Sequence, residues 1–139
     1  MQSTAPAPGS ALTGSTAALL GQARLVLDEA RATADIGERF RLAHLAALRV
    51  AAALLADRGR PAGVRRRLMS VWVLIDTVAP EYSEWARYFA AGAPARAAIE
   101  AGSRHAVTAR DADDQVRSAG DFLRLVEVSV GMLAAPMAS

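Results

Sequence analysis

The segment from residue 108 onward carries the most constraining pattern in the sequence. Its apolar residues recur at alternating steps of four and three, at Ala112, Val116, Ala119, Leu123, Val126 and Val130. These steps place side chains on one face of an α-helix, whereas a strand needs a step of two. The sequence therefore predicts a long helix with one apolar face. Thr108 and Asp111 have the spacing of a capping box at its start.

A second long helix is predicted from Asp35 to about Asp57. Asp35 and Glu38 again have capping spacing. The residues that follow are apolar on most sides of a helix and include Phe40, Leu42, Leu45, Leu48, Val50, Ala51, Leu54 and Leu55. A helix that is apolar nearly all round is a central one. We therefore expect this helix to be the most buried element and to pack against the helix that starts at Thr108.

Shorter helices are predicted around these two. One runs from Ser15 or Thr16 to about Thr33, with an apolar stripe at Leu20, Ala23, Leu27 and Ala30. Ser70 is expected to cap a short helix over residues 71–79. Pro80 suits the first turn of a fourth helix, which we expect to end near Gly92 and to be followed by a short turn over residues 95–101. The predicted fold class is all-α, an up-down helical bundle of four to five helices over residues 15–130.

The ends of the chain and its composition set further limits. Residues 1–14 are rich in small residues and predict a disordered N-terminal tail, and residues 131–139 predict a flexible C-terminal tail. The chain has no cysteine, so disulfides and thiolate chemistry are excluded. No apolar run reaches the roughly 20 residues that span a bilayer, and the first residues do not have the pattern of a secretory signal. We therefore expect a cytoplasmic protein without membrane contact.

Several segments resemble HEPN domains. The run from Glu38 to Leu55 (ERFRLAHLAALRVAAALL) is similar to the first long helix of those domains, and the run from Val107 to Glu127 is similar to their closing helix. Between them, Ser70-Val71-Trp72 and residues 79–85 (APEYSEW) resemble the middle of a small actinobacterial HEPN-like family. The resemblance covers roughly residues 16–130. It implies a bundle of four to five helices that often dimerises.

The resemblance also implies a relation to RNA. Many HEPN domains bind RNA, and some cleave it without a metal through an Arg-x(4–6)-His motif at the dimer seam, whereas others are inactive binding or regulatory modules. Arg39 and His44 fit Arg-x4-His, and Arg41 lies three residues before His44. A histidine can exchange a proton with a ribose hydroxyl and an arginine can neutralise the phosphate. Arg39, Arg41 and His44 are therefore the candidate catalytic residues.

Two observations weaken that assignment. The motif of HEPN nucleases usually lies in a later helix, and five residues of a regular helix leave the side chains of Arg39 and His44 about 140° apart. The alternative is a buried His44 that bonds to a hydroxyl or carboxylate of a neighbouring helix. The second histidine, His105, is expected to be an exposed loop residue.

The segment over residues 58–67 is the candidate nucleic-acid contact. It contains two glycines, a proline and five arginines, which are Arg58, Arg60, Arg65, Arg66 and Arg67. Such a cluster could contact phosphates, although no aromatic residue is interleaved for base stacking. The alternative is a solvated basic loop, since all sixteen basic residues of the chain are arginine and fourteen acidic residues are interspersed with them.

No metal and no cofactor are expected. Asp111, Asp113 and Asp114 suit the positive end of the helix dipole, and residues at i, i+2 and i+3 of a helix do not converge on one ion. Trp72, Trp85, Tyr88 and Phe89 are expected in the core or at a dimer interface.

The sequence thus favours a non-catalytic HEPN-like interaction module that forms a homodimer and binds RNA or a protein partner. The alternative function is a metal-independent endoribonuclease that uses His44 with Arg39 or Arg41. A third hypothesis is an assembly protein whose apolar helix face pairs with another chain.

Overall fold

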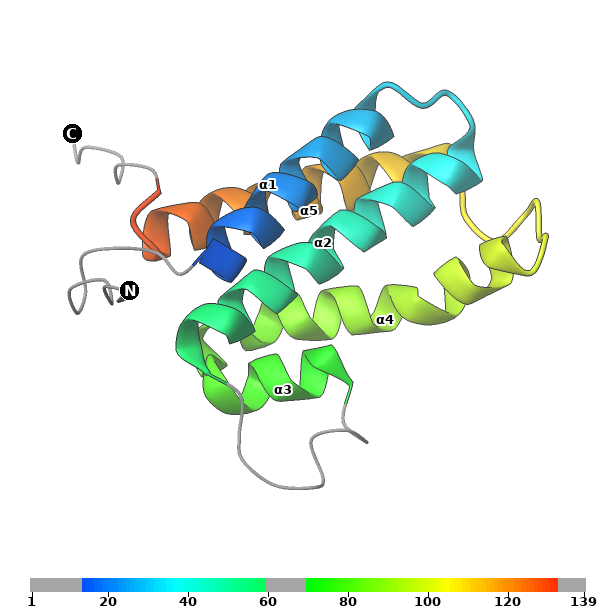
Figure 1. Cartoon of the computed structure of the whole chain (residues 1–139). Coiled ribbons are helices and arrows are strands. Elements are labelled where there is room, and N and C mark those ends of the chain that lie inside the picture. Colours follow the sequence, from blue (N-terminus) through cyan, green and yellow to red (C-terminus); the bar gives the residue numbers. More distant parts are fainter. Residues whose placement is uncertain (1–13, 60–69, 133–139) are drawn as a thin grey trace, which may run out of the picture.

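The computed structural model describes residues 14–59 and 70–132, and this part of the chain is an all-α bundle (Figure 1). Its elements in chain order are α1 (Gly14–Arg31), α2 (Ile36–Arg58), α3 (Val71–Val78), the 3₁₀ turn η2 (Pro80–Tyr82), α4 (Ser83–Glu100) and α5 (Ala109–Ser129). The predicted fold class is confirmed.

Side-chain caps define the starts of three helices, as the sequence predicts. Asp35 accepts the backbone N–H of Glu38 at 2.9 Å, and Ser70 accepts that of Val73 at 3.2 Å. Thr108 and Asp111 form a complete capping box, in which each side chain accepts the other residue's backbone N–H. Such caps satisfy N–H groups that have no partner within the helix.

Three helices, α1, α2 and α5, form a closely packed layer. In Figure 1 α1 lies beside α2 and antiparallel to it, and α5 passes behind α1; both α1 and α5 pack against α2. Many of the side chains buried here are alanines, which let the helix axes approach closely. The buried alanines of this layer are Ala23, Ala30, Ala43, Ala46, Ala47, Ala51, Ala53, Ala112 and Ala119. The predicted pairing of the two long helices is thereby confirmed.

Aromatic side chains fill the space between this layer and α3, η2 and α4. Phe122 of α5 contacts the rings of Trp72, Tyr82, Trp85 and Phe89, with centroid distances between 5.5 and 6.4 Å. Trp72 and Phe89 are buried and Trp85 packs against the core, whereas Tyr88 remains 41% exposed. The backbones of α4 and α5 do not approach closely, since rings lie between them.

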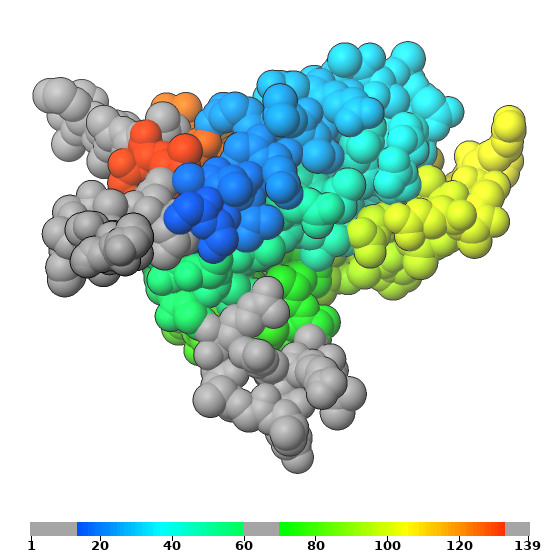
Figure 2. Space-filling model, in the orientation of Figure 1, coloured from blue at the N-terminus to red at the C-terminus, as the bar shows by residue number. Residues whose placement is uncertain are grey.

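The predicted end of the fourth helix is wrong. We expected it to stop near Gly92, but α4 continues through Gly92 and Pro94 to Glu100. A Cβ on Gly92 would lie 3.3 Å from Phe40 Cζ and 3.4 Å from His44 Cδ2, so the glycine serves close packing against α2 rather than helix termination. In the space-filling view the far end of α4, in yellow, projects beyond the rest of the bundle (Figure 2).

The predicted tails concern residues that lie mostly outside the described ranges. The tails were predicted over 1–14 and 131–139, but Gly14 already belongs to α1. Gly131 and Met132 continue from α5 in a turn, in which the N–H of Met132 donates to the carbonyl of Glu127 at 2.8 Å. No helix of the described part is long and apolar enough to cross a membrane.

Candidate functional site around His44

His44 lies in the centre of the bundle. It is 1% exposed, and its Nε2 donates a hydrogen bond to the backbone carbonyl of Phe89 in α4 at 2.9 Å. The ring of Phe40 stacks against it at 6.3 Å, and Trp72 and Phe89 meet it edge-on. Its Nδ1 has no hydrogen-bond partner among the described residues. Because a carbonyl can only accept, the Nε2 of His44 carries the hydrogen of this bond.

The environment favours the neutral form of His44. Burial lowers the pKa of His44 below its usual value, because a charged ring loses its hydration. The hydrogen bond to the Phe89 carbonyl acts in the opposite direction, Arg96 lowers the pKa further, and Glu100 raises it. The net direction is downward. His44 is therefore uncharged at neutral pH and is shielded from solvent.

Arg39 holds the connection between α1 and α2 in place. Its Nε donates to the carbonyl of Thr33 at 3.0 Å and a terminal nitrogen donates to the carbonyl of Ala34 at 3.3 Å. The same guanidinium forms an ion pair with Asp113 of α5. Arg39 thus ties the α1–α2 connection to α5.

Arg41 pairs with an acid on its own helix. Its Nε and a terminal nitrogen donate to the two carboxylate oxygens of Glu38 at 2.9 and 2.7 Å. This bidentate pair lowers the pKa of Glu38 and raises the pKa of Arg41. The structure therefore places Arg39, Arg41 and His44 in three separate settings and does not bring the candidate catalytic residues together.

The partner of His44 differs from the expected hydroxyl or carboxylate. A backbone carbonyl takes that role, and no residue type in the sequence indicates a backbone carbonyl. Pro94 does not supply the signal either, because the N–H that it lacks would bond the carbonyl four residues earlier, which is that of Ala90 and not of Phe89. Because the sequence predicts a helix end near Gly92, it does not predict the contact between His44 and Phe89.

Of the five candidate nucleic-acid arginines, only Arg58 lies within the described residues. It ends α2 and donates to a carboxylate oxygen of Glu81 at 2.6 Å, a contact that lowers the pKa of Glu81 and raises that of Arg58. The described part of the chain holds twelve arginines and all fourteen acidic residues. The other four arginines are Arg60, Arg65, Arg66 and Arg67, which lie outside the described residues.

The three aspartates at the start of α5 have separate roles. Asp111 completes the capping box, Asp113 pairs with Arg39, and Asp114 pairs with Arg117. His105 is exposed in the connection between α4 and α5, and its backbone N–H donates to the hydroxyl of Ser103 at 3.3 Å.

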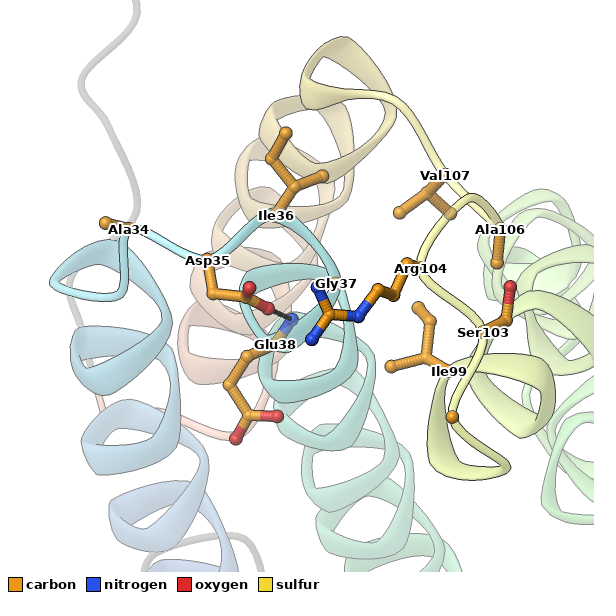
Figure 3. A pocket seen from close by; sticks show the side chains of 11 residues that line it. Ala34, Asp35, Ile36, Gly37, Glu38, Ile99, Ser103, Arg104, Ala106 and Val107 are labelled. Atoms are coloured by element: carbon orange, nitrogen blue, oxygen red, sulfur yellow. Dashed lines mark hydrogen bonds between the residues drawn. The ribbon is translucent and has the colours of Figure 1, made fainter.

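A cavity of about 590 Å³ lies between the start of α2 and the α4–α5 connection (Figure 3). Asp35, Gly37 and Glu38 form one wall, and Ile99 and Arg104 belong to the other. In Figure 3 the guanidinium of Arg104 extends across the opening toward the first turn of α2. The carboxylate of Asp35 is occupied by the helix cap and that of Glu38 by Arg41. The nearest acids are thus already engaged.

A second pocket, of about 340 Å³, lies on the other side of the same connection, between α4 and α5. Ala106 and Val107 line both spaces. Tyr88 and Gly92 contribute from α4, and the residues from α5 are Asp111, Asp114 and Gln115. Gly92 brings this pocket next to the edge of the His44 ring.

A groove of about 490 Å³ lies between α1 and α5. Four arginines line it, together with Asp121 and Glu127: Arg24, Arg31, Arg117 and Arg124. Arg24 forms an ion pair with the buried Glu127, Arg31 with Asp28, and Arg117 with Asp114. The groove therefore has mixed charge rather than a continuous basic surface.

These features define a small all-α bundle with a neutral histidine sealed between its second and fourth helices. The profile of the SAV_6107-like HEPN family matches residues 30–127, which is well over half of the chain. The chain belongs to this HEPN family. Most of α1 precedes the matched region, although α1 packs along α2. No curated protein and no solved structure matches the chain significantly.

Proposed function

We propose that this protein is a non-catalytic HEPN module that forms a homodimer and binds a protein partner. One observation carries the non-catalytic part of the proposal: His44 is 1% exposed and its Nε2 donates to the carbonyl of Phe89. A general acid or base must come within hydrogen-bond reach of the substrate proton. Substrate would reach this ring only if α2 and α4 separated and the bond to Phe89 broke.

The contacts of Arg39 and Arg41 also support a non-catalytic module. An arginine that stabilises a scissile phosphate needs a free fork of N–H donors. Arg39 uses its donors on Thr33, Ala34 and Asp113, and Arg41 uses its Nε and one terminal nitrogen on Glu38. The endoribonuclease alternative would therefore need several structural contacts to be exchanged for contacts with RNA.

The charge of the described bundle favours a protein partner over RNA. Its acids outnumber its arginines by fourteen to twelve, and six ion pairs distribute that charge. Nucleic-acid binders usually concentrate basic charge on one face. Apolar side chains are exposed as well, among them Leu25 at 71% and Leu125 at 46%. Self-association is supported by the family, since HEPN domains often dimerise.

Catalysis is tested by incubating the purified chain with mixed RNA in EDTA. We expect no cleavage above that of a matched Arg39→Gln, Arg41→Gln double variant. Cleavage by the wild-type chain that disappears in this double variant, with helicity retained by circular dichroism, would contradict the non-catalytic assignment. The arginine variants are preferred to a His44 variant because a change at His44 also disturbs the core.

Self-association is tested by sedimentation equilibrium over a wide concentration range. We expect a reversible monomer–dimer equilibrium. A strict monomer at every concentration would remove the homodimer from the proposal, whereas the assay for catalysis would be unaffected.

RNA binding is the second candidate, favoured by the location of the charge. The four arginines outside the described residues turn a bundle of net charge −2 into a chain of net charge +2. If they contact phosphates, Arg65→Glu, Arg66→Glu and Arg67→Glu should each flatten the salt dependence of RNA binding by about one unit. An unchanged slope in filter-binding measurements would remove this segment as an RNA contact.

A further inference from the structure

The pocket between α4 and α5 has two acidic residues in its α5 wall. Asp111 and Asp114 line it, and no arginine or histidine is among its lining residues. One oxygen of Asp111 accepts the N–H of Thr108, and one oxygen of Asp114 accepts from Arg117. Each carboxylate therefore keeps a second oxygen that can accept a hydrogen bond. Two such oxygens near one pocket favour a cationic donor.

The rest of the pocket suits an apolar stem that carries such a cation. Ala91, Ala95 and Val107 line it with small or branched apolar groups. Tyr88, which is 41% exposed, adds an aromatic ring at the α4 wall. Aromatic rings attract guanidinium groups, and the stem of an arginine packs along apolar surface.

Gln115 supplies an independent observation. It lines the same pocket, yet it is only 3% exposed and its Nε2 has no hydrogen-bond partner among the described residues. A buried donor without a partner costs free energy, so it favours a ligand that brings an acceptor. A peptide carries backbone carbonyls next to its side chains. Gln115 thus favours an occupant that carries an acceptor such as a peptide carbonyl, in addition to the cationic donor that the two carboxylates favour.

We propose that this pocket binds an arginine side chain of a protein partner. The guanidinium pairs with the free oxygens of Asp111 and Asp114, its stem packs against Ala91 and Val107, and a neighbouring peptide carbonyl accepts from Gln115. The planar fork of arginine can engage two carboxylates at once, which a lysine ammonium does less well. The inference assigns a site and a partner chemistry to the proposed interaction function and does not depend on the homodimer.

The direct test is an NMR titration of the ¹⁵N-labelled full chain with acetyl-Gly-Arg-Gly-amide. We expect saturable shifts at the amides of Tyr88, Gly92 and Gln115 in the millimolar range. The same peptide with citrulline, which keeps the shape without the charge, should bind at least about tenfold more weakly, since a charge-assisted hydrogen bond contributes more than a neutral one.

Two variants complete the test. Asp114→Asn should weaken the arginine peptide by about tenfold. Asp121→Asn, an exposed carboxylate on the same helix that lines the α1–α5 groove instead, should leave binding unchanged. The dispersion of each spectrum shows directly whether the variant is folded.

The proposal is overturned by any of three results: no saturable shift, equal binding of the citrulline peptide, or shifts centred on the α1–α5 groove. Failure here would leave the non-catalytic assignment standing, because that assignment is measured by the RNA assay.

Discussion

The two sides of α2 are packed by different means. α2 packs extensively against α1 and α5 and buries five alanines, each at most 1% exposed, beside its leucines and Val50. Toward α3 and α4 the contacts are made by rings, with Trp72 and Phe89 stacked at 5.4 Å. Small side chains let helices approach closely, whereas rings hold α4 away from α5. The difference explains why the α4–α5 pocket lies on the aromatic side.

The two sides of α2 are sensitive to opposite changes in side-chain volume. A core of closely spaced alanines tolerates no added volume, because neighbouring backbones leave no room for it. A core of rings is more sensitive to lost volume, because a deleted ring leaves a large cavity. Each side can therefore be tested by the substitution to which it is most sensitive.

The largest effect is expected for Phe122→Ala on the aromatic side. Phe122 is fully buried and contacts four rings, so its truncation should lower the free energy of unfolding by about 3–5 kcal/mol. Urea unfolding measures this. Leu125→Ala, a 46% exposed site on the same helix, is the control and should cost no more than about 0.5 kcal/mol. Similar losses at both sites would contradict the aromatic core.

The next effect is expected for Ala23→Leu on the alanine side. Ala23 is fully buried where α1 packs against α2 and α5, so the added carbons should cost about 1–3 kcal/mol. Ala18→Leu places the same side chain at an exposed position of α1 and should change stability by about 0.5 kcal/mol or less. A neutral Ala23→Leu would mean that α1 does not pack as closely as described.

A smaller effect is expected where α5 begins. Thr108→Ala removes the hydroxyl that accepts the N–H of Asp111 at 3.0 Å and should cost about 1 kcal/mol. Thr108→Ser keeps that hydroxyl and should cost much less. Thermal unfolding distinguishes the two, and equal losses would rule out the cap as the cause.

The smallest effect is a pH dependence centred on His44. Because the folded pKa of His44 is lowered, the unfolded chain binds more protons at mildly acidic pH. The stability contributed by neutral His44 is therefore fully present above the unfolded pKa of about 6.5 and falls as the pH drops below it. Urea unfolding between about pH 7.5 and 5.5 should show this loss in the wild type and in His105→Gln, but not in His44→Gln. A flat wild-type profile would contradict the lowered pKa.

Local signals in the sequence predicted most of the fold. The caps at Asp35, Ser70 and Thr108 and the apolar steps of the last helix each depend on residues close together in the chain, so they are visible without the structure. The end of α4 was not predictable in this way. Gly92 is a residue type that is common at helix ends, yet α4 continues through it. Only the close contact of Gly92 with Phe40 and His44 of α2 explains why a glycine lies within the helix.

The candidate site was less predictable than the fold. Arg39 and His44 match a catalytic spacing. The sequence does not reveal that Arg39 forms an ion pair with Asp113 of α5, or that His44 donates a hydrogen bond to a backbone carbonyl of α4. Gln115 gave no signal at all, because a lone glutamine in a polar stretch becomes notable only when it is found buried without a partner. The partners of Arg39 and His44 and the burial of Gln115 all depend on contacts between helices that are distant in the sequence.

The central claim is that His44 is a neutral structural donor rather than a catalytic base, and NMR of its imidazole nitrogens as a function of pH tests it most directly. We predict that Nε2 carries the proton at neutral pH, with a visible coupling to a slowly exchanging hydrogen, and that the ring gains its charge only below the usual histidine pKa. A ring that exchanges rapidly with solvent and gains its charge near pH 6.5 would contradict the claim.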